Sequence, residues 1–281
     1  MRNEERRMES LRRWAIALTL IASASTAMAD VVEIASPSPV SFGQFGLSVS
    51  GIPDINGDGA GDFIVGAWDE TGGAAQSGRV HVYSGRTGAL IRSHSSPNSE
   101  FGGSFGVSVA GISDINGDGR GDYIVGAYQE DGLGFTDSGR VYVYSGANGA
   151  LIRTHTMPGA KNFGRFGFSV DGVPDLTGDN KPEYIVGATG AGTDGGVFIY
   201  NGASGALIRS HLAPATAAGG EFGWSVSGVP DVDGDGADPT GAADARLIYL
   251  TPANQYPLGK RLSLARREAV IAHARACDAM I

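Results

Sequence analysis

A pentapeptide of the form Phe-Gly-x-Ser-Val recurs four times along the chain and constrains the fold more than any other feature. The four copies begin at residues 45, 105, 166 and 222, so they lie 60, 61 and 56 residues apart. Self-similarity at a period of this size is typical of architectures in which each repeat is one supersecondary unit. The segments inside one repeat therefore predict the fold of the whole array.

Each repeat contains four short segments with the composition of β-strands. The pentapeptide is the first, and the second is an apolar run ending in Ile-Val-Gly-Ala, which we expect to be buried on both faces. Glycine accounts for 45 of 281 residues, roughly twice its usual ~7%, which indicates frequent turns between short strands. Four strands per unit predict an all-β fold of β-propeller-type blades of four antiparallel strands. The second, third and fourth segments lie at 63–67, 79–83 and 89–92, at 123–127, 140–144 and 150–153, and at 184–188, 196–200 and 206–209.

A loop rich in oxygen side chains joins the first and second predicted strands. Its first, third, fifth and ninth positions carry side-chain oxygens, and its seventh would offer a backbone carbonyl. Ca²⁺ takes six to eight oxygen ligands, and a tight loop can direct alternate positions at one ion. The sequence therefore predicts a calcium site in each loop. The candidate ligands are Asp54, Asn56, Asp58, Ala60 and Asp62 in loop 1, Asp114, Asn116, Asp118, Arg120 and Asp122 in loop 2, and Asp175, Thr177, Asp179, Lys181 and Glu183 in loop 3.

Neither an EF-hand nor a simple hairpin turn accounts for these loops. An EF-hand needs a bidentate Glu at its twelfth position and flanking helices. Here the twelfth positions are Val65, Val125 and Val186, inside predicted strands, so the loops are not EF-hands. Hairpin turns explain single Asp-Gly pairs, but not four matched oxygen positions whose like charges would repel one another without a cation.

The later loops depart from the pattern. Loop 3 has Thr177 at its third position and Asn180 in place of the glycine at its sixth. A fourth loop keeps Asp231, Asp233 and Asp235, but its ninth position is Pro239, which has no side-chain oxygen. We leave open whether the fourth loop binds metal.

The order Phe-Gly, then Asp-x-Asn-x-Asp-Gly, then Ile-Val-Gly-Ala resembles the FG-GAP repeat of integrin α-subunit β-propellers and related bacterial exported proteins. The resemblance covers residues 42–236, and three motifs recur in the same order in three units. The proline that often follows Gly-Ala in that family is replaced by Trp68, Tyr128 and Thr189. The resemblance implies a calcium-dependent propeller that binds partners at or outside the cell surface.

The N-terminus has the features of a secretory signal peptide. Five arginines precede an apolar run at residues 14–24, and Ala27-Met28-Ala29 forms a cleavage pattern. The run is shorter than the ~20 residues of a membrane span, so we expect cleavage after residue 29 and a periplasmic, extracellular or cell-surface location, with an uncleaved anchor as the alternative. The net charge of −9 argues against nucleic acid as a partner.

The repeat pattern stops after Asp238. We expect a signal peptide at 1–29, blades at about 42–100, 101–161 and 162–220, part of a fourth at 221–238, and a divergent tail at 239–281 that is rich in Ala and Arg and favours helix. The tail is interpreted either as a capping element or as the product of a truncated or frame-shifted gene. Because propellers have about four to eight blades, this number cannot close a ring. We therefore predict that the chain self-associates through the open ends or is unstable without further blades.

The leading functional hypothesis is a secreted calcium-binding module, not an enzyme, that engages an extracellular protein or glycan through the variable loops between second and third strands. His94, His155 and His211 occupy one place in successive units and are interpreted as structural, because a catalytic histidine is needed once. No nucleophile elbow, zinc motif or phosphate loop is present. An enzyme on a propeller scaffold and an inactive fragment are the alternatives.

Overall fold

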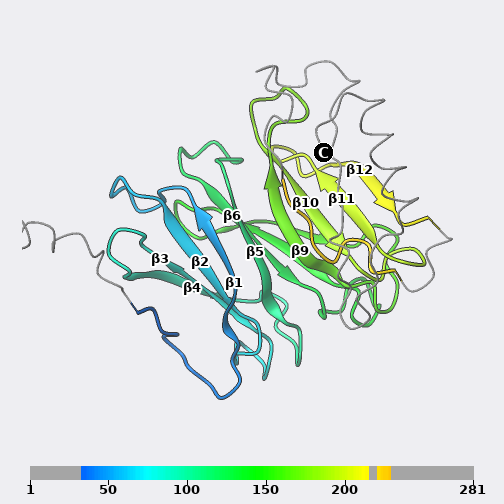
Figure 1. Ribbon diagram of the computed structural model, residues 1–281, viewed down its shortest axis with the longest axis horizontal. Coiled ribbons are helices and arrows are strands. Elements are labelled where there is room, and N and C mark those ends of the chain that lie inside the picture. Colours follow the sequence, from blue (N-terminus) through cyan, green and yellow to red (C-terminus); the bar gives the residue numbers. More distant parts are fainter. Residues whose placement is uncertain (1–32, 215–219, 229–281) are drawn as a thin grey trace, which may run out of the picture. The chain divides into compact units, whose positions relative to one another are not determined.

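The computed structural model describes residues 33–214 and 220–228, and all twelve strands lie within the unit Ala35–Ile281. The strands form three four-stranded antiparallel sheets, each with its strands in chain order. Figure 1 shows the sheets following one another, with β5 and β6 between the other two. The expected all-β fold of four-stranded blades is confirmed. The predicted signal peptide and tail, and loop 4, lie outside the described residues.

The three sheets are named blades 1, 2 and 3. Blade 1 comprises β1 (Phe45–Ile52), β2 (Asp62–Ala67), β3 (Arg79–Tyr83) and β4 (Leu90–Ser95). Blade 2 comprises β5 (Phe105–Ile112), β6 (Asp122–Ala127), β7 (Arg140–Tyr144) and β8 (Leu151–Thr156). Blade 3 comprises β9 (Phe166–Val173), β10 (Glu183–Ala188), β11 (Gly196–Tyr200) and β12 (Leu207–Leu212).

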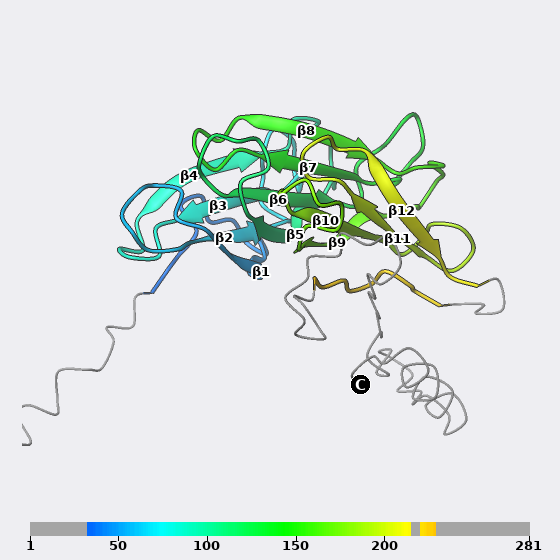
Figure 2. The same cartoon turned by 90° about the horizontal axis from the view of Figure 1, so that it is seen from above.

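The hydrophobic core lies between the blades. Strand β5 packs on β1 and β2, and β9 packs on β5 and β6, as the view in Figure 2 also shows. One apolar cluster joins blade 1 to blade 2 through Val80, Phe105 and Tyr123, and a second joins blade 2 to blade 3 through Val141, Phe166 and Tyr184. Neighbouring blades therefore bury their broad faces against each other, as propeller blades do.

The two glycines of the repeat motif meet at this contact. Gly106, after the phenylalanine, has φ +91° and lies at a bulge where the pairing of β5 with β6 shifts register. Its carbonyl oxygen lies so close to Gly66 of blade 1 that a Cβ on Gly66 would be only 2.0 Å away. The same approach recurs between Gly126 and the carbonyl of Gly167. The bulge at the first motif glycine and the close backbone approach at the second leave no room for a side chain, so both positions are glycine.

Candidate metal centres

Each oxygen-rich loop joins the first strand of a blade to the second. Its ninth position is the first residue of the second strand, so Asp62, Asp122 and Glu183 begin β2, β6 and β10. These three carboxylates are buried, with relative exposures of 3%, 0% and 0%. Most of the remaining loop positions are at or near the surface. Each loop therefore combines one buried carboxylate with accessible residues around it.

The first-position aspartates fold the loops. In loop 1 the backbone amide of Gly57 donates to Asp54 Oδ1 at 2.6 Å, and that of Gly59 donates to Oδ2 at 2.8 Å. Asp114 accepts the equivalent bonds in loop 2. The amide of Gly59, followed by that of Gly57, lowers the pKa of Asp54 against the opposing effect of desolvation. Each loop therefore holds this carboxylate ionised.

Residues at the fourth and sixth positions adopt positive φ. The values are +84° and +83° at Gly57 and Gly59, and +61° at Asn180, the residue that interrupts the pattern in loop 3. Asparagine tolerates this region better than most residues, so loop 3 keeps the same turn. The amide of Asn180 accordingly donates to Asp175 Oδ2 at 2.6 Å.

The ninth-position carboxylates are bound by neutral donors. Asp122 accepts from the amides of Ile115 and Gly146, at 2.9 and 3.0 Å, and Asp62 has the equivalent partners in blade 1. Burial raises the pKa of Asp122, and the charges of Asp118 and Asp114 raise it further. Burial also raises the pKa of Glu183. A bound cation would stabilise both in their ionised form.

Sequence reasoning missed a residue, in the turn between the third and fourth strands, that orients a candidate ligand. Ser84 and Ser145 donate to Oδ2 of the fifth-position aspartates Asp58 and Asp118, at 2.9 and 2.7 Å. Asn201 takes this place in blade 3 and donates to Asp179 Oδ2 at 2.8 Å. The signal was present in the sequence, because these residues directly follow the tyrosine that ends the third strand of every repeat.

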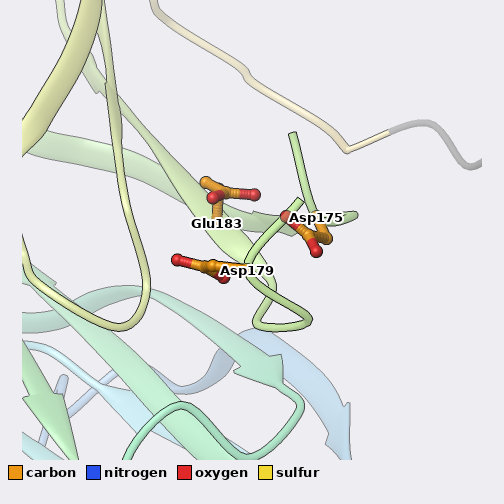
Figure 3. A group of neighbouring side chains, drawn as sticks. All are labelled: Asp175, Asp179 and Glu183. Carbon is orange, nitrogen blue, oxygen red and sulfur yellow. The ribbon is translucent and has the colours of Figure 1, made fainter. Parts of the chain in front are cut away.

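Loop 3 brings its three carboxyl groups together. Oxygens of Asp175, Asp179 and Glu183 lie within 4.8 Å of one another, and Figure 3 shows the side chains around the turn. Within the described part of the chain, this is the acidic group close enough to hold one metal ion. Thr177 Oγ1 donates to Glu183 Oε1 at 3.0 Å, so the hydroxyl at position three also faces the cluster. Of the three loops that the structure describes, the one that departs most from the sequence pattern therefore has its acidic groups closest together.

Basic side chains lie at the rims of loops 1 and 2. The guanidinium of Arg120, at position seven of loop 2, lies 3.9 Å from Asp54 Oδ2, and the ammonium of Lys181 in loop 3 lies 3.7 Å from Asp114 Oδ2. Arg86 Nε is 3.4 Å from Asp58 Oδ1. At the third position, Asn56 and Asn116 accept the amides of the fifth-position aspartates through Oδ1.

The donor sets fit a hard divalent cation. Loops 1, 2 and 3 each offer carboxylate oxygens at positions one, five and nine, an amide or hydroxyl oxygen at position three and a carbonyl at position seven. Such all-oxygen sets suit Ca²⁺ or Mg²⁺ better than soft metals, which prefer sulfur or imidazole. The buried ninth-position carboxylates, which have neutral partners, are the observation that favours a cation here.

The repeated histidines lie elsewhere and bridge blades. His94 Nε2 is 2.7 Å from the hydroxyl of Tyr123, and His155 Nε2 is 2.6 Å from that of Tyr184. Burial, followed by a nearby arginine, lowers the pKa of each imidazole to about 4. Both are neutral at pH 7, in agreement with a structural role.

Comparison with known proteins identifies the repeats. The family model for the FG-GAP repeat matches residues 45–83 and 105–144. Integrin alpha-PS3 of Drosophila melanogaster is 31% identical over 196 residues, which are 66% of this chain and 17% of that protein. Human integrin alpha-11 is 33% identical over 52% of the chain, and mouse integrin alpha-7 is 40% identical over 47%.

The chain spans less than a fifth of the length of these relatives, with coverage of 17%, 12% and 11%. The similarity therefore concerns the repeats and not the whole relatives. Blade 3 lies outside the residues that the family model matches, but it has the strand order and glycine contacts of blades 1 and 2. By its two matched repeats and its integrin α relatives, the chain is a protein with FG-GAP repeats.

Proposed function

We propose that this chain is an exported, non-catalytic adhesion module whose blades are stabilised by Ca²⁺ in the loops between first and second strands. The observation that carries the metal assignment is loop 3, where three carboxyl groups lie within 4.8 Å and one of them is fully buried. We assign as ligands the first, third, fifth, seventh and ninth positions of loops 1, 2 and 3. The calcium would neutralise these charges and fix the start of the second strand.

The proposed binding surface is the set of loops between the second and third strands. In blade 2 this loop projects Leu133 and Phe135, with exposures of 69% and 40%. Apolar side chains exposed on a rigid scaffold are typical of contact sites, and the integrin α similarity favours an extracellular protein as the ligand, with a glycan as the second candidate. Self-association through the open blade faces is proposed as well.

We propose export through a signal peptide at residues 1–29, followed by the three blades, part of a fourth, and a separate tail from residue 239. The structure does not describe either terminal segment. Across the residues that it does describe, there is no helix of the length and hydropathy that crossing a bilayer requires.

Calcium dependence of unfolding tests the metal assignment. Extracellular modules bind Ca²⁺ at about 10⁻⁴–10⁻³ M, and an ion at ten times its dissociation constant adds roughly 1.4 kcal/mol per site. We expect millimolar Ca²⁺ to raise the melting temperature by several degrees, and a chelator to reverse this. Asp58→Ala combined with Asp118→Ala should remove most of the effect from loops 1 and 2. Identical melting curves with and without chelator would contradict the assignment.

A single substitution in loop 3 gives a sharper test because its effect should change sign. Asp179→Asn relieves repulsion among the three carboxyl groups, so the variant should melt above the wild type in chelator. It also removes a charged ligand, so it should gain less from Ca²⁺. The exposed Glu221, outside these loops, provides a charge-matched control as Glu221→Gln. Loss of stability of equal size with and without Ca²⁺ would show that Asp179 acts only in local hydrogen bonding.

A further inference from the structure

One glycine in blade 1 has no structural reason to be glycine. Gly51 lies within β1, its φ is not positive, and a Cβ there would meet nothing within 4 Å. The equivalent Gly111 in blade 2 lies against blade 1, where a Cβ would be 2.2 Å from the carbonyl oxygen of Gly51. Gly172 is similarly close to Ile112 of blade 2. Glycine inside a strand marks a close backbone approach. Among the described residues, no backbone lies on the side of Gly51 that a Cβ would occupy.

The apolar side chains around Gly51 are open as well. Val49 is 59% exposed, whereas its counterparts Val109 and Val170 are 8% and 7% exposed. Leu47, two residues earlier, is 63% exposed. This face of blade 1 therefore has the residues of a blade-to-blade contact without a preceding blade among the described residues.

At the other end of the array, residues 222–228 occupy the seat of a fourth blade's first strand. Phe222 bridges Gly195, as Phe105 bridges Gly78 and Phe166 bridges Gly139. Ser169 donates to the carbonyl of Gly223 at 2.8 Å, and a Cβ on Gly228 would lie 1.9 Å from the carbonyl of Gly172. The segment pairs with no second strand in the part of the chain that the structure describes.

That segment and the start of β1 are nearly the same peptide. Residues 222–228 read Phe-Gly-Trp-Ser-Val-Ser-Gly and residues 45–51 read Phe-Gly-Leu-Ser-Val-Ser-Gly. The seat on blade 3 would therefore accept β1 in the same register. The difference is that β1 brings three further strands with it.

The outer strand of blade 3, β12, also lacks, among the described residues, the contacts that β4 of blade 1 makes with the next blade. In blade 1, Arg92 donates to the carbonyls of Ser145 and Ala147 in blade 2, both at 3.4 Å, and His94 meets Tyr123. The equivalent residues of β12, Arg209 and His211, are exposed and have no side-chain partner within residues 33–214 and 220–228. A full blade on this side would supply turn carbonyls for the arginine.

We infer that blade 1 of a second copy of this chain docks on blade 3, with its β1 taking the seat of residues 222–228. Gly51 of the second copy then lies against the carbonyl of Gly172, and its Val49 fills the apolar site of Val226. Arg209 reaches the turn carbonyls at residues 84–86 of the second copy. This inference names the surfaces for the proposed self-association and does not rest on the metal sites.

The contact is heterologous, because it joins one face of blade 1 to a different face of blade 3. Such contacts close into rings or continue as filaments. Two copies of the three blades in the described part of the chain contribute six blades, and two identical contacts would close them into a ring. Six lies within the range of about four to eight for propellers. We therefore expect a dimer.

Two substitutions of equivalent valines should act in opposite directions. Val49→Asp places a charge in the docking face and should shift the dimer to monomer. Val226→Asp loosens the competing segment, because Val226 is 7% exposed against blade 3, and should strengthen dimerisation. The mass is measured by light scattering and sedimentation on the full chain at fixed Ca²⁺, with circular dichroism to verify the fold.

Two gentler variants separate docking from folding. Gly51→Ala meets no atom in the isolated chain, so it should leave unfolding unchanged while weakening dimerisation at least tenfold. Phe63 is the blade 1 counterpart of Tyr123 and Tyr184, and Phe63→Tyr adds a hydroxyl that would meet His211 across the contact. A hydrogen bond of this kind should tighten the dimer about threefold to tenfold.

The outcomes separate the candidate occupants. A wild type that is monomeric at all concentrations overturns the inference, and it leaves the calcium test unaffected. Dimerisation that Val49→Asp abolishes, but that Val226→Asp and Phe63→Tyr do not change, indicates two blade 1 faces packed together and also overturns it. Opposite effects of the two valine substitutions support the exchange at the seat of residues 222–228.

Discussion

Blades 1 and 2 have nearly the same sequence motifs but different surroundings. Blade 2 has a neighbour on both faces, whereas the face of blade 1 that carries Leu47 and Val49 is open. Val109 is 8% exposed and Val49 is 59% exposed, although they occupy the same position of the repeat. The motif residues therefore specify the contact between blades rather than the stability of a single sheet. Their energetic value therefore depends on which blade holds them.

A second contrast lies in the buried site beneath the loop that follows the second strand. In blade 1 this site holds Glu70 with His81, at 3.0 Å. In blade 2 it holds Glu130, which accepts from the hydroxyls of Ser96 and Tyr142. In blade 3 the equivalent residues are Met157, Ala191 and Phe198, all apolar and buried. The same position of the repeat thus holds a different set of side chains in each blade, and Glu130 in blade 2 links folding to pH.

The largest difference in stability between blades 1 and 2 should appear when the glycine near the end of the first strand is substituted. A Cβ on Gly111 would lie 2.2 Å from the carbonyl of Gly51 and 2.7 Å from Ile52 Cγ2, so Gly111→Ala must separate blades 1 and 2. We expect it to lower the free energy of unfolding by about 2–4 kcal/mol. Gly51→Ala should be neutral or stabilising by about 0.5 kcal/mol in the monomer. Urea denaturation at a concentration where the chain is monomeric measures both, and equal losses would contradict the contrast.

The next effect is a pH dependence of stability that arises at Glu130 of blade 2. Burial raises the pKa of Glu130 from 4.5 to about 7, against the opposing hydroxyl bonds. Glu100 raises this pKa further, while Arg140, with Nε 3.8 Å away, lowers it. Because the folded state holds this proton more tightly than the unfolded state, the stabilisation is complete below pH 4.5. It is lost as the pH rises through about 7.

Glu130→Gln keeps the site uncharged at every pH and isolates this effect. The wild type should lose up to about 3 kcal/mol relative to the variant between about pH 5 and pH 8. His94 and His155, with lowered pKa values, make both proteins less stable in acid, and their contribution cancels in the difference. The difference in stability between the two proteins is measured from their denaturant midpoints across this pH range. A constant difference between the two proteins would show that Glu130 titrates normally.

A smaller effect is expected from the valines. Val109→Ala removes two buried methyl groups at the contact between blades and should lower the free energy of unfolding by about 2 kcal/mol. Val49→Ala should change it by less than about 0.3 kcal/mol in the monomer, since Val49 is mostly in solvent. Should dimerisation be present, the loss at Val49 would grow with protein concentration. The same loss at both positions in dilute solution would contradict the open face.

Sequence predicted most of the fold, because the repeat shows which segments are strands and how often they recur. The strand containing Ile-Val-Gly-Ala begins within one residue of the expectation, and the third strand of each blade matches it. The first and fourth strands run further than predicted, to Ile52 and Ser95 in blade 1. Their extra residues are half polar, and partner strands determine where such segments end.

The candidate site was less accessible to sequence reasoning. The candidate ligand positions follow from the spacing of the motif, but the motif does not show which side chains from other repeats lie beside them. Loop 3 departs from the pattern at Thr177 and Asn180, yet its carboxyl groups lie closest together. Two of the basic side chains at loops 1 and 2, Arg120 and Lys181, come from the next blade, 66 and 67 residues away. Nothing in a single repeat reveals such contacts.

The smallest predicted effect concerns these basic residues and separates loop 1 from loop 2. Arg120 and Asp54 form a surface pair at 3.9 Å, so Arg120→Ala should change the free energy of unfolding by less than about 1 kcal/mol in chelator. Removing this positive charge should tighten Ca²⁺ binding to loop 1 a few-fold, equivalent to about 1 kcal/mol or less. Loop 2 keeps Lys181 beside Asp114 and keeps the carbonyl of residue 120, so its affinity should not change. Calcium titration by calorimetry, with Lys181→Ala as the matched variant for loop 2, measures each site. Weaker binding in loop 1 after Arg120→Ala would show that the guanidinium organises the loop rather than competing with the cation.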